Sequence, residues 1–239
     1  MSEDNFENLS KKERRILARE TRKSEENKSS LISKIIRISI YLLLLLGIGF
    51  ILYSFLKPSS NSENINTESL TIADNDWVKG NRESKNIFFE FSDFQCPACA
   101  SYQPLVKQIS EELSGQVKVV YKHFPLSSIH KNAFDAARVS EAAGKQEKFW
   151  EMHDLLFNLQ DDWAEENNAY LKFEEYAKSL ELDIDIFKID FESQDVRSKI
   201  ENDIKLGNSL RINATPTFFL NGKKLNLPIT FDKIKSLLE

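Results

Sequence analysis

The two cysteines of the 239-residue chain lie three positions apart, in the segment Cys96-Pro97-Ala98-Cys99. An apolar run, Ile-Phe-Phe-Glu-Phe at residues 87–91, precedes them, and a helix-forming stretch follows. Proline suits the first position of a helix, because the N–H group that it lacks would have no partner there. We therefore expect Cys96 at the helix N-cap, where free N–H groups and the helix dipole stabilise a thiolate. Cys96 is predicted to be the nucleophile, and Cys99 is predicted to resolve mixed disulfides.

Two structural interpretations compete with this redox site. A structural zinc ion needs about four ligands, and the three histidines lack the spacing that would complete a tetrahedral site: His123, His130 and His153. A purely structural disulfide between cysteines so close in sequence would constrain the unfolded chain little. We therefore expect no metal and no cofactor.

The composition indicates a globular protein with a polar, mixed-charge N-terminal segment at residues 1–37. The net charge of −5 argues against a nucleic-acid-binding protein. A capping-box pattern that begins at Ser10 predicts a short exposed helix over residues 11–22.

Residues 38–56 contain no charged side chain, and Arg37 and Lys57 flank them. A helix of this length spans roughly 28 Å, close to the thickness of the hydrocarbon core of a bilayer. We predict a single transmembrane helix that is retained, since no small-residue cleavage pattern of a signal peptide follows it. Basic residues are more frequent before this segment than after it, which predicts a cytoplasmic N-terminus and an extracytoplasmic catalytic domain in the cell membrane.

The remaining chain divides into a polar linker at residues 57–76 and a folded domain at residues 77–239. The linker contains one short apolar stretch, residues 70–72, that could form an edge strand. In the domain, a strand, the cysteine helix and a second strand at residues 116–124 predict a βαβ unit. Hydrophobic periodicity predicts a helical block over 130–144, 149–159, 171–180 and 183–191, then a helix from about 196 to 207. Asn221-Gly222 predicts a type I′ hairpin that connects the segment 214–220 to a return strand at 223–227, and a final helix is expected over 230–238.

This order of motifs resembles the thioredoxin superfamily, and more narrowly its membrane-anchored, DsbA-like thiol:disulfide oxidoreductases. The resemblance covers residues 77–239. It is carried by four segments in the family's order: residues 90–99, residues 121–126, the stretch from Ala136 to Trp150, and Thr215-Pro216-Thr217. It implies an α/β, thioredoxin-like fold with a helical insertion, preceded here by the predicted transmembrane helix.

The resemblance also implies roles for individual residues. The Thr215–Pro216 peptide bond is expected to be cis, which places Thr215 beside Cys96, where its backbone pairs with a substrate segment. Phe94 is likewise expected to contact substrate. Glu90 matches a buried acid that relays a proton to and from the resolving cysteine, although an exposed strand carboxylate is the alternative.

The resemblance implies that the protein oxidises cysteine pairs in exported proteins. A quinone-linked membrane protein of the DsbB or VKOR type would re-oxidise it. We expect the enzyme to be a monomer. The strongest oxidants of the family carry a histidine between the two cysteines, where this sequence has Ala98. We therefore expect a reduction potential between about −270 and −120 mV. Two alternatives stay open at this point. One is an extracytoplasmic reductase or isomerase, and the other is a non-catalytic thioredoxin-like scaffold.

Overall fold

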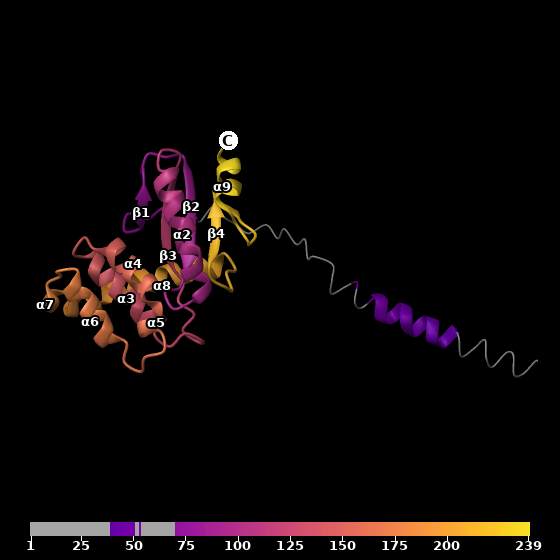
Figure 1. Cartoon of the computed structure of the whole chain (residues 1–239), viewed down its shortest axis with the longest axis horizontal. Helices are drawn as coiled ribbons and strands as arrows, with labels where there is room; N and C mark the ends of the chain where they lie inside the picture. Colours follow the sequence, from indigo (N-terminus) through magenta and orange to yellow (C-terminus); the bar gives the residue numbers. More distant parts are fainter. Residues whose placement is uncertain (1–38, 51–52, 54–69) are drawn as a thin grey trace, which may run out of the picture. The chain divides into compact units, whose positions relative to one another are not determined.

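The computed structural model describes residues 39–50, 53 and 70–239 (Figure 1). Residues 39–50 are helical, and their large apolar side chains are exposed. Across the described residues, no helix is both long enough and apolar enough to cross a membrane. The rest of the predicted span 38–56, the predicted helix 11–22 and most of the predicted linker lie outside the described residues.

A five-stranded mixed sheet in the order β1-β3-β2-β4-β5 forms the centre of the folded unit. Its strands are β1 (Trp77–Gly80), β2 (Asn86–Ser92), β3 (Val117–His123), β4 (Thr217–Leu220) and β5 (Lys223–Lys224). Strands β2 and β3 are parallel and connected through α2 (Pro97–Glu112), which confirms the predicted βαβ unit. Every other neighbouring pair is antiparallel.

Helices cover both faces of the sheet. Helix α2 and α9 (Phe231–Leu238) enclose one apolar layer with side chains such as Phe88 and Phe218. Residues at the end of α8 (Gln194–Ser209) enclose the other layer, which contains Phe89 and Phe219. The insertion between β3 and α8 forms a helical subdomain of α3 (Ala133–Gly144), α4 (Phe149–Asn158), α5 (Gln160–Trp163), α6 (Tyr170–Ser179) and α7 (Ile184–Glu192). In Figure 1 this subdomain lies at one end of the sheet.

Local sequence signals located most of these elements. The predicted hairpin is confirmed, since Asn221 and Gly222 both have positive φ, as a type I′ turn requires. Asp183 caps α7 by accepting hydrogen bonds from two backbone N–H groups of its first turn. The return strand is shorter than predicted, since β5 comprises Lys223 and Lys224 alone, although the Leu225 N–H also donates to the Phe218 carbonyl oxygen at 2.9 Å.

The start of the domain differs from the sequence prediction. Residues 70–72 form no strand, and the first edge strand is β1, which the sequence reading did not identify. Leu70 is nevertheless buried in an apolar cluster, and Asp76 is buried among charged partners. Residues 70–76, assigned to the linker from their polar composition, therefore belong to the folded unit.

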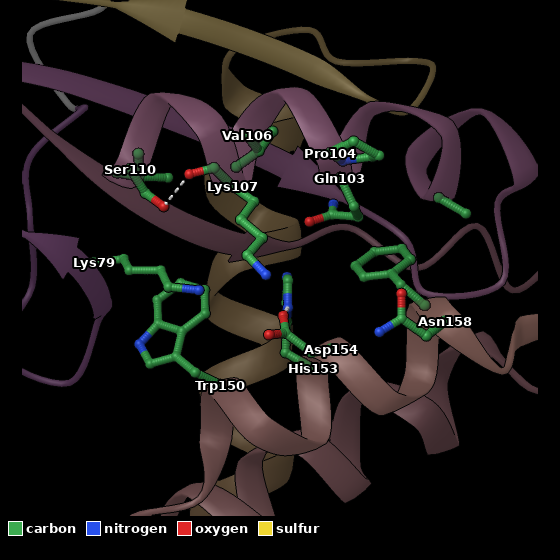
Figure 2. A pocket seen from close by; sticks show the side chains of 13 residues that line it. Lys79, Gln103, Pro104, Val106, Lys107, Ser110, Trp150, His153, Asp154 and Asn158 are labelled. Carbon is green, nitrogen blue, oxygen red and sulfur yellow. Dashed lines mark hydrogen bonds and ion pairs between the residues drawn. The ribbon is translucent and has the colours of Figure 1, made fainter. Parts of the chain in front are cut away.

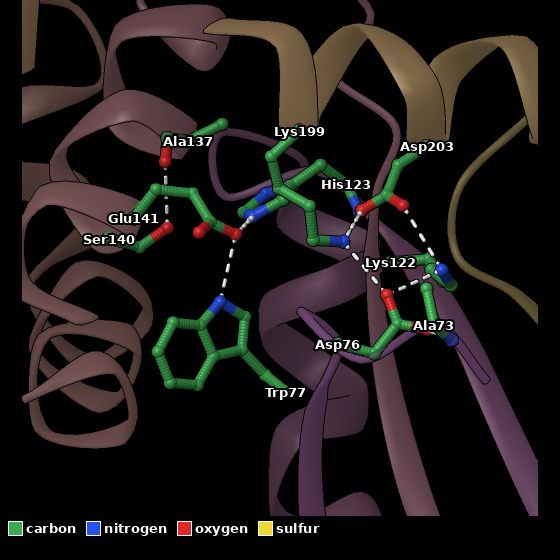
Figure 3. A network of polar contacts seen from close by, with 10 residues as sticks. All are labelled: Ala73, Asp76, Trp77, Lys122, His123, Ala137, Ser140, Glu141, Lys199 and Asp203. Carbon is green, nitrogen blue, oxygen red and sulfur yellow. Dashed lines mark hydrogen bonds and ion pairs between the residues drawn. The ribbon is translucent and has the colours of Figure 1, made fainter. Parts of the chain in front are cut away.

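A buried ionic quartet fixes this first segment to the sheet and to α8 (Figure 3). Asp76 accepts hydrogen bonds from Lys122 at 2.6 Å and from Lys199 at 2.9 Å. Asp203 accepts from the same two lysines, at 3.1 Å and 2.7 Å. Two positive and two negative charges balance, as burial of such groups requires.

Candidate active site

Cys96 occupies the N-cap of α2, as the sequence predicts. Its side chain is 7% exposed, while that of Cys99, one turn further along α2, is fully buried; both are free thiols. The exposed residues between them, Pro97 and Ala98, leave the Cys96 side of the helix end open to a partner. A substrate sulfur approaching from solvent therefore meets Cys96 first.

The surroundings of Cys96 favour its thiolate. The thiol of Cys99 donates a hydrogen bond that does most to lower the pKa of Cys96, to about 5. The Thr215 hydroxyl and the backbone N–H groups of Cys99 and Ala98 lower it further, whereas burial opposes the shift. The pKa of Cys99 is raised well above its ordinary value, first by burial and then by the neighbouring Cys96. Of the two sulfurs, Cys96 is thus the one that is ionised at neutral pH.

The loop before β4 brings Thr215 to the cysteines. The Thr215–Pro216 bond is cis, and the Cys96 thiol donates to the Thr215 carbonyl oxygen at 3.5 Å. The Thr215 hydroxyl is buried and has no hydrogen-bond partner. It can therefore donate to the Cys96 sulfur when the thiol is ionised. Thr215 thereby lies where the resemblance implied.

Glu90 lies on β2 and is 1% exposed, which excludes the alternative of an exposed strand carboxylate. Burial raises its pKa to about 7, while hydrogen bonds from Ser92 and Gln103 partly oppose the shift. The Gln103 amide, on α2, donates to the Glu90 carboxylate at 2.9 Å. A carboxyl group with a pKa near neutrality can both accept and return a proton at physiological pH.

Phe94 does not lie where the resemblance implied. It is 1% exposed and stacks on Tyr121, with their ring centroids 5.3 Å apart. Phe157 of α4 covers another side, at 4.9 Å between centroids. The packing of α4 against this end of the sheet therefore removes Phe94 from any substrate surface, and its side chain stabilises the joint between sheet and helical subdomain.

Several residues that support the cysteine loop were missed from the sequence. Gln160 of α5 donates to the carbonyl oxygens of Phe94, at 2.6 Å, and of Cys96, at 3.2 Å. The Asp93 carboxylate accepts from the Gln95 N–H at 2.8 Å and also contacts His130 at 2.7 Å. Only the Asx-turn spacing of Asp93 was visible as a local signal, because Gln160 comes from an element more than sixty residues away.

Each of the three histidines weighed as zinc ligands contacts a carboxylate. His123 contacts Glu141 at 2.7 Å, and His153 contacts Asp154 at 2.8 Å. Among the described residues, no group of three or more histidine, cysteine or acidic side chains is arranged to bind a metal ion.

Comparisons with known proteins agree with this geometry. The sequence model of the thioredoxin family matches residues 73–239. Curated relatives include the Na(+)/H(+) antiporter NhaA 3 of Salinispora tropica, 33% identical over 163 residues, and NhaA 1 of Mycolicibacterium vanbaalenii, 37% identical over 151 residues. These matches cover 68% and 62% of this chain but 24% of each relative. The chain thus spans about a quarter of the length of these antiporters.

Solved structures extend the comparison. α-DsbA1 of Wolbachia pipientis superposes with a TM-score of 0.64 at 24% identity, covering 72% of this chain and 93% of that one. BdbD of Bacillus subtilis, in its oxidised form, superposes with a TM-score of 0.59 at 26% identity, covering 67% and 89%. The fold, the cysteine pair at the helix N-terminus and the family match lead to one conclusion: the chain belongs to the thioredoxin family and has the fold of DsbA-like proteins.

Proposed function

We propose that this protein oxidises cysteine pairs of exported proteins through a Cys96–Cys99 disulfide. The observation that carries the proposal is the opposite tuning of the two sulfurs, which lowers the pKa of Cys96 to about 5 and raises that of the buried Cys99. A stabilised thiolate makes Cys96 a good leaving group, which favours the reduced enzyme as product and hence oxidation of the substrate.

The reaction runs in two exchange steps. A substrate thiolate attacks the Cys96 sulfur of the disulfide, the sulfur–sulfur bond breaks, and Cys99 leaves with the electron pair. Glu90, protonated below a pH of about 7, gives its proton to the Cys99 sulfur. A second substrate thiolate then attacks the substrate sulfur of the mixed disulfide, and Cys96 leaves as a thiolate. Two substrate thiols become one disulfide, and the enzyme disulfide becomes a dithiol.

Substrate specificity in this proposal is broad and relies on the backbone. The Thr215 carbonyl, 3.5 Å from the Cys96 sulfur, lies in the loop just before β4, where an extended substrate segment pairs as an added strand. Main-chain pairing does not depend on substrate side chains, which suits an enzyme that acts on many unfolded proteins.

The proposed location is the outer face of the cell membrane, with the N-terminus in the cytoplasm. Its support is the uncharged stretch at residues 38–56 and the distribution of basic residues around it. An anchored enzyme remains at high effective concentration near a membrane re-oxidase, for which a quinone-linked protein of the DsbB or VKOR type is the proposed partner.

A trapping experiment tests the proposal. In the Cys99→Ser variant, the Cys96 thiolate can attack a disulfide of an exported protein, which breaks the substrate sulfur–sulfur bond and expels one substrate thiolate. No enzyme thiol is then present to attack the Cys96 sulfur and resolve the mixed disulfide. We expect cells that express the full-length variant to accumulate such adducts, which a reducing agent dissolves. The matched control is Cys96→Ser, which should trap nothing. Equal absence of adducts from both variants would contradict the proposal.

The redox state of the wild-type protein in cells separates the oxidase from the reductase or isomerase. Alkylation of free thiols in intact cells should find the Cys96–Cys99 pair mostly as a disulfide if the protein is an oxidase. A mostly reduced pair would favour the alternative. If neither an oxidant nor a reductant changes the redox state of the Cys96–Cys99 pair, the result would favour the non-catalytic, thioredoxin-like scaffold.

A further inference from the structure

Gln160 of α5 is a buried amide side chain that reaches from the helical subdomain to the cysteine loop, residues 93–96. We propose that Gln160 is a positioning residue for the reaction at Cys96, because its amide holds the backbone on both sides of the reactive residue. The inference rests on the proposed function and adds a side chain outside the thioredoxin-like core that tunes the nucleophile. Gln160 acts through the backbone of the loop, so its effect must be measured at Cys96 rather than at a substrate.

One amide nitrogen of Gln160 binds two carbonyl groups of the loop. The Gln160 Nε2 atom donates to the carbonyl oxygen of Phe94 at 2.6 Å and to that of Cys96 at 3.2 Å. The amide of a glutamine side chain has two N–H donors, and these two bonds use both. The backbone between the two carbonyl groups consists of Gln95 and Cys96, so this bridge restrains the dihedral angles of the helix N-cap residue itself.

The Cys96 carbonyl group connects this bridge to the sulfur. Its oxygen also accepts from the Ala100 N–H at 3.1 Å, which is the first hydrogen bond of α2. The N–H groups of Ala98 and Cys99, in the same turn, bind the Cys96 sulfur and lower the pKa of its thiol. A restrained Cys96 carbonyl keeps this turn fixed relative to the Cys96 side chain, so the N–H groups stay directed at the sulfur. Loss of the Gln160 donors should therefore weaken the stabilisation of the thiolate.

A second amide reaches in the opposite direction, from the loop to the subdomain. The Gln95 amide donates to the Ala164 carbonyl oxygen at 2.6 Å, and the Ala164 N–H donates to the Gln160 carbonyl oxygen at 2.9 Å. Asn132, before α3, supports both partners: its N–H donates to the Gln95 side-chain oxygen at 2.7 Å, and its amide donates to the Ala164 carbonyl oxygen at 3.1 Å. The three amide side chains are buried, so a broken bond would leave a polar group without a partner. The joint therefore favours one geometry, and it presents Gln160 to the loop from a fixed position.

Further along α2, the subdomain packs less closely against the cysteine helix (Figure 2). A cavity of about 250 Å³ lies there, and the residues that line it include Lys107 of α2 and Trp150 and Asp154 of α4. Figure 2 shows Lys107 pointing from α2 into this space, towards Asp154. Close packing holds neighbouring elements in place, and a cavity interrupts it. The position of the cysteine loop against the subdomain therefore depends on the contacts at the start of α2, where Gln160 binds.

Titration of the reduced, full-length protein tests the proposal. Gln160→Met keeps the length of the side chain and removes both N–H donors. The midpoint of the Cys96 thiolate absorbance should rise from about 5 by about one pH unit, which is the effect of one buried hydrogen bond of ordinary strength. The matched control is Gln146→Met, which removes an amide that also makes two hydrogen bonds in the subdomain, both to the backbone of Asp183. This control should leave the midpoint unchanged.

Equilibrium with glutathione gives a second measurement. A less stable thiolate makes the reduced protein less stable relative to its disulfide, so the constant for oxidation of glutathione at pH 7 should fall roughly tenfold in Gln160→Met. Gln146→Met should keep the wild-type constant. A Gln160→Met protein that unfolds at lower urea concentration but keeps the wild-type midpoint and constant would overturn the proposal, since its role would then be structural alone. Gln160→Leu, which also lacks donors, gives the same test if Gln160→Met does not fold. If both measurements change as expected but Cys99→Ser traps no exported protein, the positioning role stands and the proposed function fails.

Discussion

The Cys96 thiol lies 3.5 Å from the carbonyl oxygen of Thr215, a residue 119 positions later in the chain. This contact places the reactive sulfur beside the loop that leads into β4, next to the Thr215 hydroxyl, which has no other hydrogen-bond partner. The site therefore combines three sources of thiolate stabilisation: the resolving cysteine, the start of α2 and the loop before β4.

The ionisation of Cys96 gives the first prediction. The ultraviolet absorbance of its thiolate should titrate with a midpoint at about pH 5. Cys99→Ala removes the largest stabilising hydrogen bond, so it should move the midpoint furthest towards the ordinary value of 9.0, and Thr215→Val should move it less. Ser101→Ala, one turn away and exposed, should leave it unchanged. A wild-type midpoint near that of free cysteine would contradict the assignment of Cys96 as nucleophile.

The same shift makes the stability of the reduced protein depend on pH. Because the folded pKa of Cys96 is lowered, its contribution to the free energy of unfolding is complete above the ordinary pKa of 9.0 and is lost as the pH falls through about 5. The free energy of unfolding of the reduced form minus that of the oxidised form should therefore decrease over this range. Urea unfolding at a series of pH values measures it. In Cys96→Ser, which forms no disulfide, the free energy of unfolding should lack the pH-dependent part that the reduced wild type loses as the pH falls towards about 5.

Glu90 gives a prediction of opposite sign. Its folded pKa is raised from 4.5 to about 7, so the folded state binds a proton that the unfolded state has released between these pH values. Stability that is complete below pH 4.5 is lost as the pH rises through about 7, at most about 3 kcal/mol in total. Glu90→Gln should be more stable than the wild type at pH 8, by urea unfolding, yet resolve mixed disulfides at Cys99 roughly a hundredfold more slowly. Glu111→Gln, an exposed acid on α2, is the control.

The buried ionic quartet gives a prediction about stability alone. Lys199→Met leaves Lys122 as the one cation shared by Asp76 and Asp203, so one buried negative charge is no longer balanced. We expect this to lower the free energy of unfolding by about 3–5 kcal/mol. Adding Asp203→Asn restores neutrality around the Lys122–Asp76 pair and should recover part of that loss. The exposed Lys205→Met should change the free energy of unfolding by less than about 0.5 kcal/mol. A loss of the same size in the control would mean that the quartet is not the cause.

Packing at Gly144 gives the last prediction. A methyl group there would collide with the ring of Trp77, which stacks on Phe149 at 4.4 Å between centroids and donates to Glu141 at 2.8 Å. Since both contacts hold the ring in place, Gly144→Ala should cost about 1–3 kcal/mol and alter tryptophan fluorescence. Gly115→Ala, where the methyl group would meet nothing within 4 Å, is the matched control. Unfolding by urea, followed by fluorescence, measures both.

The sequence by itself determined the features that depend on neighbours along the chain. Pro97 after Cys96 established the N-cap, and Asn221-Gly222 established the hairpin turn. Each follows from backbone geometry within a few residues, so no knowledge of packing was needed. The cysteine spacing and the order of motifs were enough to indicate the family and the redox chemistry.

Only the tertiary structure decided which side chains are buried and what they meet. Strand alternation places Glu90 on one face of β2, but its hydrogen bond to Gln103 depends on how α2 packs across that face. The burial of Phe94 and the role of Gln160 could not be predicted from the sequence either. The helical subdomain covers Phe94 and contains Gln160, and it is distant from the cysteines in sequence. The burial, charge pairing and pKa of a side chain depend on all the residues that surround it in the folded protein. A sequence pattern describes only the residues that are its neighbours along the chain.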